Sequence, residues 1–216
     1  MAAAIDDGAS MIGLVFFEKS PRNVTFEAAA DLAAFARDKS GGNLQIVALT
    51  VNADYAELEA ICANVQPDIL QLHGSETADH VRHVKAITAT TIMKAIGVSE
   101  AADFDRLRPY SSVADRLLID AKPPKGSVLP GGNGLTFDWN ILDALTLDIS
   151  GGLPVMLSGG LTPENITAAV HLSQAHPVIS GIDVSSGVET SPGIKDKGLI
   201  ETFLQRAQAA AASPNP

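Results

Sequence analysis

Short apolar runs rich in β-branched residues alternate along this chain with longer amphipathic or alanine-rich stretches. Seven such runs are expected to be strands: Met11–Phe17, Gln45–Val51, Ile69–His73, Thr91–Ile96, Arg116–Lys122, Pro154–Ser158 and Ile179–Val184. The stretches between them include four expected helices: Phe26–Arg37, Tyr55–Val65, Ala78–Ile87 and Pro163–Leu172. Because strands joined through helices pair in parallel, the alternation predicts an α/β fold built on a parallel sheet.

A closed barrel of this class has eight strands, each followed by a helix. Met1–Asp7 is expected to be a helix that ends at Gly8-Ala9, directly ahead of the strand Met11–Phe17. Such a helix is the second half of a βα unit, so we predict a TIM (β/α)8 barrel whose first strand is absent from this chain. The alternative is an open parallel sheet whose first helix simply precedes it.

The length and composition fit one domain with a core of small aliphatic residues. Of the 216 residues, 46% are hydrophobic and only 5% are aromatic, which suits α/β packing better than a sandwich built on large rings. No interior linker interrupts the pattern. We therefore expect a single domain over residues 1–208 and a frayed tail over residues 209–216.

Charge and hydropathy exclude several classes of partner. A net charge of −10 argues against nucleic acid, which is met by basic stripes, and it requires an anionic ligand to be caught by local donors. No segment approaches the roughly 20 apolar residues of a membrane helix. The single cysteine, Cys62, precludes an internal disulfide, which fits a cytoplasmic location. We expect it to pack on its helix as a small hydrophobe.

Two glycine- and serine-containing segments follow the last two expected strands. Gly159-Gly160 leads straight from one strand into a helix expected to be capped by Thr162-Pro163, and Ser185-Ser186-Gly187 follows the next strand. Glycines let the backbone approach a ligand closely, and exposed N–H groups at helix starts bind anions. In β/α barrels a phosphate often lies after the seventh and eighth strands. We therefore predict phosphate binding here, with ordinary turns as the alternative.

A third glycine-rich segment, Gly131–Trp139, follows the strand Arg116–Lys122. It lacks the spacing of a nucleotide-binding P-loop, so we interpret it as a loop near the barrel mouth that is suited to act as a lid. Within it, Asp138 is expected to cap a helix and Trp139 to pack.

Asp120 and Arg22 are the main candidates for chemistry. Asp120 ends a buried strand, where burial can raise a carboxyl pKa enough for general-acid catalysis; a structural Asp bonded to loop amides is the alternative. Arg22 follows the first expected strand and can clamp an anion through its planar fork, or lie solvated in its loop. His73 ends the expected strand Ile69–His73, and Lys94 lies within the next expected strand, Thr91–Ile96. No spacing of histidines indicates a metal site.

The segments in their order resemble the phosphoribosylanthranilate isomerase family from Met1 to about Gln208. The matching segments are Val15–Arg22, Gln71–Gly74, Leu118–Lys122, Gly131–Trp139, Ser158–Asn165 and Asp183–Glu189. The resemblance implies the Amadori rearrangement of N-(5-phosphoribosyl)anthranilate to 1-(2-carboxyphenylamino)-1-deoxyribulose 5-phosphate in tryptophan biosynthesis, without a cofactor or metal.

The resemblance also implies roles for single residues. Asp120 matches the general acid that protonates the furanose oxygen, and Arg22 matches the arginine that faces the anthranilate carboxylate. The backbone around Gly159-Gly160 and Ser185-Ser186 would receive the phosphate. Four further residues are assigned to substrate binding: His73, Lys94, Gly132 and Asp183.

The sequence departs from the family pattern in one serious respect. The family opens with a strand whose cysteine is the general base, and no such strand precedes Met1 here, while Cys62 is on another element. A downstream start in a longer reading frame is the favoured explanation, with a truncated remnant as the alternative. The chain as written is expected to turn over weakly or not at all. Asn133, Leu135 and Ser158 are milder departures.

Two other functions remain open at this point. One is another phosphate-binding barrel enzyme, such as ribulose-phosphate epimerase, and the other is a non-catalytic phosphosugar-binding barrel. In each case the expected partner is a small phosphorylated molecule rather than nucleic acid or a membrane, and the chain is expected to be a monomer or homodimer.

Overall fold

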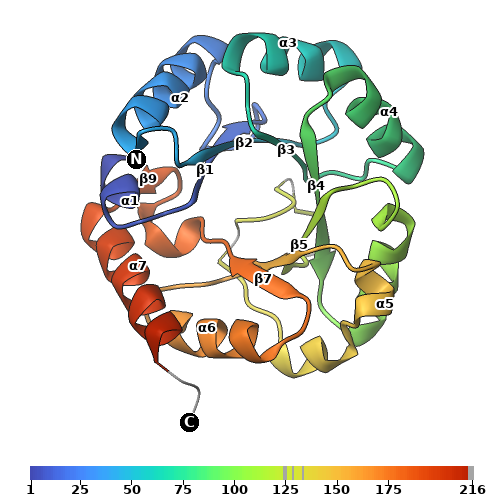
Figure 1. Cartoon of the computed structure of the whole chain (residues 1–216), viewed down its shortest axis with the longest axis vertical. Coiled ribbons are helices and arrows are strands. Elements are labelled where there is room, and N and C mark those ends of the chain that lie inside the picture. The colour runs from blue at the N-terminus through green and yellow to red at the C-terminus, as the bar shows by residue number, and fades with distance from the viewer. Residues whose placement is uncertain (124–125, 128, 133, 214–216) are drawn as a thin grey trace.

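Seven parallel strands form one curled sheet at the centre of a ring of helices (Figure 1). The computed structural model describes residues 1–123, 126–127, 129–132 and 134–213. Neighbouring strands in the sheet are neighbours in sequence: β1 Met11–Phe16, β2 Gln45–Thr50, β3 Ile69–Leu72, β4 Thr91–Val98, β5 Arg116–Ala121, β6 Val155–Leu157 and β7 Ile179–Ile182. The seven predicted strands are confirmed, and within the described residues no ladder joins β1 to β7.

The helices lie outside the sheet and follow the strands in order. They are α1 Ala2–Asp6, α2 Phe26–Ser40, α3 Tyr55–Val65, α4 Ala78–Thr88, the 3-10 helix η1 Ala101–Tyr110, η2 Trp139–Ala144, α5 Leu147–Ser150, α6 Ile166–Ala175, η3 Ser186–Val188 and α7 Lys197–Ala212. The sequence predicted α1 to α4 and α6 but neither η1 nor α5. A short hairpin, β8 Glu189–Ser191 with β9 Ile194–Lys195, precedes α7.

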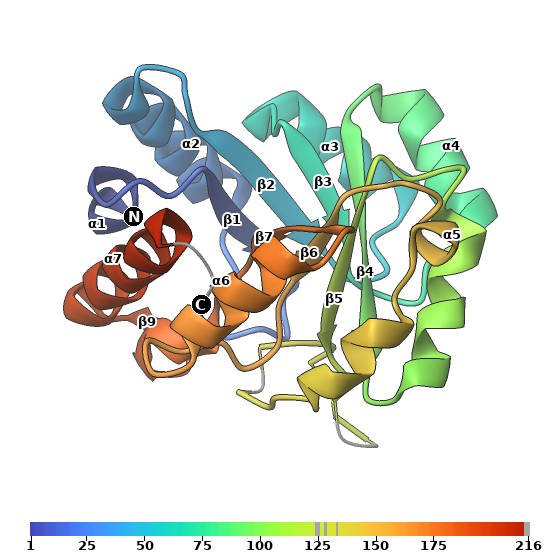
Figure 2. The same cartoon turned by 60° about the horizontal axis from the view of Figure 1, so that its bottom comes forward.

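Helix α1 lies between α2 and α7, so the first and last helices are neighbours in the ring (Figures 1 and 2). It ends at Asp6, and two residues later Gly8 has a φ of 83°, a left-handed conformation that favours glycine. The fold is that of a (β/α)8 barrel, of which this chain supplies seven described strands.

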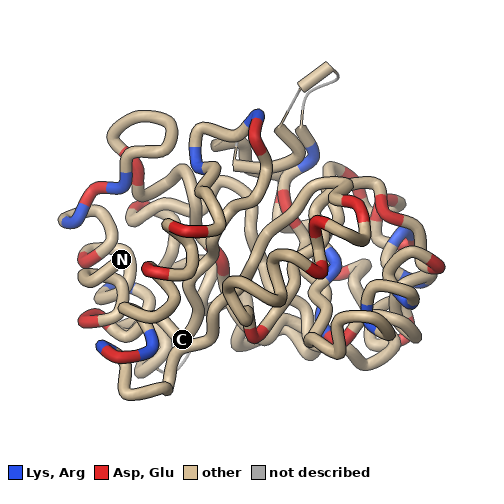
Figure 3. The backbone as a smooth tube through the Cα atoms, turned by 90° about the horizontal axis from the view of Figure 1, so that it is seen from above, with Lys and Arg blue, Asp and Glu red and all other residues tan. Residues whose placement is uncertain are grey.

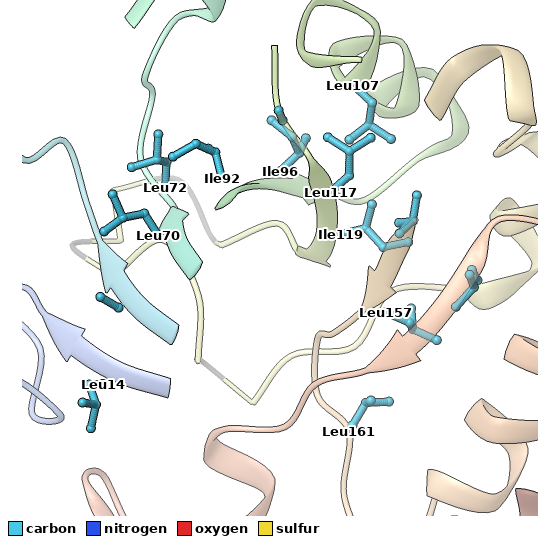
Figure 4. Close-up of a cluster of buried hydrophobic side chains, with 14 of the residues drawn as sticks. Leu14, Leu70, Leu72, Ile92, Ile96, Leu107, Leu117, Ile119, Leu157 and Leu161 are labelled. Carbon is cyan, nitrogen blue, oxygen red and sulfur yellow. The ribbon is translucent and has the colours of Figure 1, made fainter. Parts of the chain in front are cut away.

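Side chains along each strand alternate between two layers, as the period of two requires. One face packs against the helices in a large apolar cluster, which Figure 4 shows with Leu70, Ile92 and Leu117 among its members. The other face fills the barrel interior with a smaller cluster that includes Val47, Met93 and Leu118. Toward the carboxyl ends of the strands, the interior face also carries polar side chains, among them Gln71, Asp120 and Ser158, and this end holds a pocket.

Side-chain caps begin several of the helices. Asp54 accepts a hydrogen bond from the Glu57 backbone N–H at 2.9 Å, and Asp138 caps η2 as predicted. The start at Thr162-Pro163 is wrong by a few residues, since α6 begins only at Ile166. The Asn165 side chain accepts from the Thr162 N–H at 2.8 Å and holds residues 162–165 in a turn instead.

The C-terminal residues and the distribution of charge can be compared with the predictions made from the sequence. Residues 209–212 belong to α7, and residues 214–216 lie outside the described residues. Basic and acidic residues are mixed along the chain rather than gathered into a basic stripe (Figure 3). None of the helices in the described residues is long and apolar enough to cross a membrane.

Candidate active site

A pocket opens at the carboxyl ends of the strands, and the chain that follows β5 contributes to its lining. Its wall is formed by residues in or directly after β1, β2, β3, β5, β6 and β7 and by the loops that follow β1, β5, β6 and β7. The lining residues include Val15, Phe17, Arg22, Leu49, Val51, Gln71, His73, Asp120, Gly131, Gly132, Ser158, Gly159, Gly160, Asp183, Ser185, Ser186 and Gly187. With one exception, the pocket brings together every residue that the sequence assigned to a site.

Asp120 lies at the end of β5 with its carboxyl group facing the pocket and only 5% of the residue exposed. Its Oδ1 accepts a hydrogen bond from the Ala121 N–H at 2.8 Å. Burial, reinforced by the nearby charge of Asp183, raises the Asp120 pKa to about 7. At neutral pH a substantial fraction of this carboxyl group therefore holds a proton that it can donate.

His73 stands beside Asp120, with its Nε2 3.5 Å from Asp120 Oδ2. Burial, and then the positive charge of Lys94, lowers the His73 pKa to about 4, so the imidazole is neutral and the contact is not an ion pair. Gln71 Nε2 lies 3.4 Å from His73 Nδ1 on the same strand face. The loop backbone at Gly131 covers both groups so closely that a β-carbon there would collide with Asp120 Oδ2.

The two segments predicted to bind phosphate pack against each other, and both line the pocket. Gly159 and Gly160 have φ values of 94° and 63°, and a β-carbon at Gly159 would be 2.6 Å from the Ala121 nitrogen. A β-carbon at Gly187 would collide with the Leu161 carbonyl oxygen. The N–H groups of Gly159, Gly160 and Ser185 make no hydrogen bond to another described residue. They are donors suited to an anion.

Asp183 directly follows β7, lines the pocket and is half-buried. Its Oδ2 accepts a hydrogen bond from Ser158 Oγ at 2.9 Å, and burial raises its pKa. Ser158, a mild departure from the family pattern, thus donates a hydrogen bond to this half-buried carboxyl group.

Arg22 lines another part of the pocket wall, and the carboxylate of Glu189 holds its guanidinium group. Arg22 Nε donates to Glu189 Oε1 and Nη2 donates to Oε2, both at 2.8 Å. Nη2 also donates to the Gly132 carbonyl oxygen at 3.2 Å. Beside Arg22 the pocket is lined by apolar side chains of β1 and β2 and the residues after them: Val15, Phe17, Leu49 and Val51.

Comparison with known proteins agrees with this geometry. The family described as N-(5'phosphoribosyl)anthranilate (PRA) isomerase matches residues 1–206. The chain belongs to this family. The N-(5'-phosphoribosyl)anthranilate isomerase of Brucella canis is 51% identical over 214 residues, which cover 99% of this chain and 91% of that protein.

Solved isomerases of the family have the same fold. The enzyme of Thermotoga maritima is 31% identical, with a TM-score of 0.79, over 96% of this chain and 92% of its own. Another phosphoribosylanthranilate isomerase, solved with reduced 1-(o-carboxyphenylamino)-1-deoxyribulose 5-phosphate, is 28% identical with a TM-score of 0.77, over 96% of this chain and 91% of its own. The predicted family, fold and isomerase class are confirmed, and the epimerase alternative finds no support in these matches.

Lys94 is the predicted substrate-binding residue that the structure does not bring to the isomerase pocket. Its side chain points from β4 toward the helix layer, where Nζ is 2.8 Å from Glu76 Oε2. Nζ also donates to the carbonyl oxygens of Leu72, Gly74 and Ala95 at 2.8–3.0 Å. All its donors are used within the protein, so Lys94 is placed as a structural residue.

Cys62 lies on α3, outside the pocket of the isomerase. Its Sγ is 3.6 Å from Thr90 Oγ1, and burial raises its pKa, which disfavours the thiolate. Within the described residues, no group of three or more His, Cys, Asp or Glu side chains could hold a metal ion. Asn133, noted in the sequence as a departure from the family pattern, lies outside the described residues.

Three contributors to the site were missed by the sequence analysis: Gln71, Gly131 and Glu189. All three lie within segments that carry the resemblance to the family. Gln71 shares the inward parity of His73, which is a signal that periodicity could have given. Nothing in the sequence connects Glu189 to Arg22.

Proposed function

We propose that this isomerase converts N-(5'-phosphoribosyl)anthranilate into 1-(2-carboxyphenylamino)-1-deoxyribulose 5-phosphate, with Asp120 as the general acid. The observation that carries the proposal is a buried carboxyl group with a pKa of about 7, lying between two segments of free backbone donors and an arginine. One end of the pocket suits a phosphate and the other suits a carboxylate-bearing aromatic ring.

The acid has a defined task in this rearrangement. Asp120 donates its proton to the furanose ring oxygen as the C1–O bond breaks, which opens the ring to a Schiff base between C1 and the aryl amine nitrogen. Loss of the C2 proton then gives the enol-amine, which tautomerises to the C2 ketone. A proton donor near pH 7 needs a pKa near that value, and Asp120 has one because it is buried.

The two anionic ends of the substrate set its orientation in the pocket. Backbone N–H groups of Gly159, Gly160 and Ser185 would receive the phosphate, since these donors act at short range against a net charge of −10. The anthranilate carboxylate would face Arg22, with its ring against the apolar wall of Val15 and Leu49. This places the ribose between them, beside Asp120.

The C2 proton transfer requires a base in addition to Asp120. Cys62 does not meet that requirement, because it lies on α3 outside the pocket with a raised pKa. The pocket wall formed by the described residues contains no cysteine. We therefore assign to these residues the acid step and the binding of both anionic groups.

Turnover can be tested by following the loss of anthranilate-type fluorescence when substrate is added to the purified protein. Conversion, even at the weak rate expected of the chain as written, supports the isomerase assignment. Saturable binding of substrate without conversion would favour the non-catalytic phosphosugar-binding alternative, and absence of both would overturn the proposal.

The acid role predicts how turnover depends on pH. The protonated form of Asp120 is the active one, and its pKa lies at about 7. We therefore expect kcat/KM to be constant below that pKa on this limb and to fall as pH rises through it, about tenfold per pH unit above it. A profile of kcat/KM from pH 5.5 to 9 measures this, and a rate that rises steadily across pH 7–9 would contradict it.

The close packing of the phosphate segments predicts a large effect for Gly187→Ala. The new β-carbon would collide with the Leu161 carbonyl oxygen and push the two segments apart. Displacements of about 1 Å in a binding site can cost about 10²-fold in rate, so we expect kcat/KM to fall by about that factor, mainly through KM. Inhibition by inorganic phosphate should weaken in parallel.

Gly13→Ala is the matched control for that variant, because a β-carbon at Gly13 meets nothing within 4 Å. Its kinetics should match those of the unmodified protein. Unchanged KM and phosphate inhibition in Gly187→Ala would show that these segments do not hold the phosphate.

The proposal includes a reducing, cytoplasmic compartment, supported by a free Cys62, and a monomer or homodimer that binds a small phosphorylated substrate.

A further inference from the structure

Glu189 makes a two-point contact with Arg22, although it does not line the pocket itself. Its two oxygens accept from Arg22 Nε and Nη2, each at 2.8 Å, which is the parallel fork geometry of a strong arginine–carboxylate pair. The side chains are 12% and 3% exposed for Arg22 and Glu189. A pair this enclosed fixes the plane of the guanidinium group far better than a solvated loop arginine would be fixed.

Other bonds hold Glu189 in turn. Its Oε1 lies 2.9 Å from Lys195 Nζ, and its Oε2 accepts from the Gly193 N–H at 3.2 Å. Burial alone would raise its pKa, but the bonds from Arg22 and Lys195 lower it to about 2. Glu189 is therefore ionised throughout the working pH range, and its carboxylate is held by two other residues of its own β8–β9 hairpin.

The bonds leave one part of Arg22 available. Nε and Nη2 are engaged by Glu189, and Nη2 also donates to Gly132. Within the described part of the chain, Nη1 makes no hydrogen bond, and Arg22 lines the pocket. The fork is thus turned so that its outer edge meets Glu189 and its Nη1 end is left for a ligand.

We propose that Glu189 is a positioning residue for substrate recognition, which aims the Arg22 guanidinium at the carboxylate of the aryl amine. The inference rests on the proposed function, in which Arg22 receives that carboxylate. Glu189 lies three residues after the phosphate-binding Ser186. Lys195, which pairs with Glu189, also donates from its Nζ to the Ser185 carbonyl oxygen at 2.8 Å. One network therefore joins the recognition of both anionic ends.

The sign of the expected effect separates positioning from simple charge. Glu189 is an anion near the anionic end of a substrate, so on charge alone its removal would strengthen carboxylate binding. If it positions Arg22, its removal instead frees the guanidinium to adopt other rotamers, and selectivity for the carboxylate falls.

The experiment compares two substrates in each variant: N-(5'-phosphoribosyl)anthranilate and N-(5'-phosphoribosyl)aniline, which lacks the carboxylate. The ratio of their kcat/KM values measures carboxylate preference, and intrinsic reactivity cancels when variants are compared. We expect Glu189→Gln to lower this ratio about tenfold or more, since a misplaced group can cost up to about 10²-fold. A purely structural defect would lower both values equally and leave the ratio unchanged.

Two further variants make the outcome unambiguous. Arg22→Met should abolish the preference; if it does not, the proposed carboxylate site itself fails. The exposed control Glu59→Gln should retain the preference. If Glu189→Gln does not fold, Glu189→Asp replaces it, because the shorter side chain withdraws from the fork. An unchanged or increased ratio in a folded Glu189 variant, with Arg22→Met still defective, overturns the inference.

Discussion

Asp120→Asn is expected to lower kcat by about 10²–10⁴-fold while leaving KM nearly unchanged. General-acid groups contribute rate factors of this size. Asparagine has the shape of the protonated, neutral carboxyl group, and its Oδ1 can keep the bond that Asp120 accepts from the Ala121 N–H. What it lacks is a proton that can be transferred to the ring oxygen, so binding is retained and the chemical step is lost.

The measurement is steady-state kinetics of Asp120→Asn at pH 6.5, with substrate binding followed by fluorescence. Asp79→Asn, an exposed substitution on α4, controls for the loss of one acidic residue. Turnover of Asp120→Asn within tenfold of the parent would show that another group is the acid. A large rise in KM with unchanged kcat would assign Asp120 to binding instead.

The seven strands and the functional end of the sheet could be predicted because both follow from local patterns. Apolar runs of about six residues are visible to periodicity, and the carboxyl ends of parallel strands meet at one edge. Asp120 lies near the end of such a run, and Gly159 and Ser185 each directly follow one, so connectivity alone places them together. Their meeting needs no knowledge of long-range contacts.

Lys94 shows where the same reasoning should have gone further. Met93 and Ala95 fill the barrel interior, so Lys94 between them must face the helices. Parity in the sequence therefore contains the signal that Lys94 lies outside the pocket. Its partner Glu76 could not be predicted, because that residue lies in the loop before α4 and meets Lys94 only in the folded chain.

Glu189 and the start of α6 depended on contacts that no local pattern describes. The Arg22–Glu189 pair spans 167 positions and exists because the ring brings the end of β1 next to the β8–β9 hairpin. At Thr162-Pro163 the local signals for a helix start were present, but Asn165 bonds back to the Thr162 N–H and the Gly160 carbonyl oxygen. These bonds keep the turn that shapes the phosphate segment.

The largest expected effect on stability comes from Lys94→Met. The Lys94 and Glu76 side chains are 0% and 2% exposed, and Nζ is 2.8 Å from the carboxylate. Removing one partner leaves an unpaired buried charge, which costs about 3–5 kcal/mol, and it also leaves the carbonyl oxygens of Leu72, Gly74 and Ala95 without their donor. Urea unfolding should show this loss, together with a fall in Tm of about 6–20 °C.

A double variant tests whether the loss comes from the stranded charge. Glu76→Gln combined with Lys94→Met removes both charges, so it should recover part of the stability lost in Lys94→Met alone, because replacing both members of a buried pair costs far less than breaking it. The folded fraction of either variant should keep its KM, since Lys94 lies on the helix side of β4. A stable Lys94→Met protein with a raised KM would instead return Lys94 to the substrate site, and would mean that the pocket reaches through the sheet between β3 and β4.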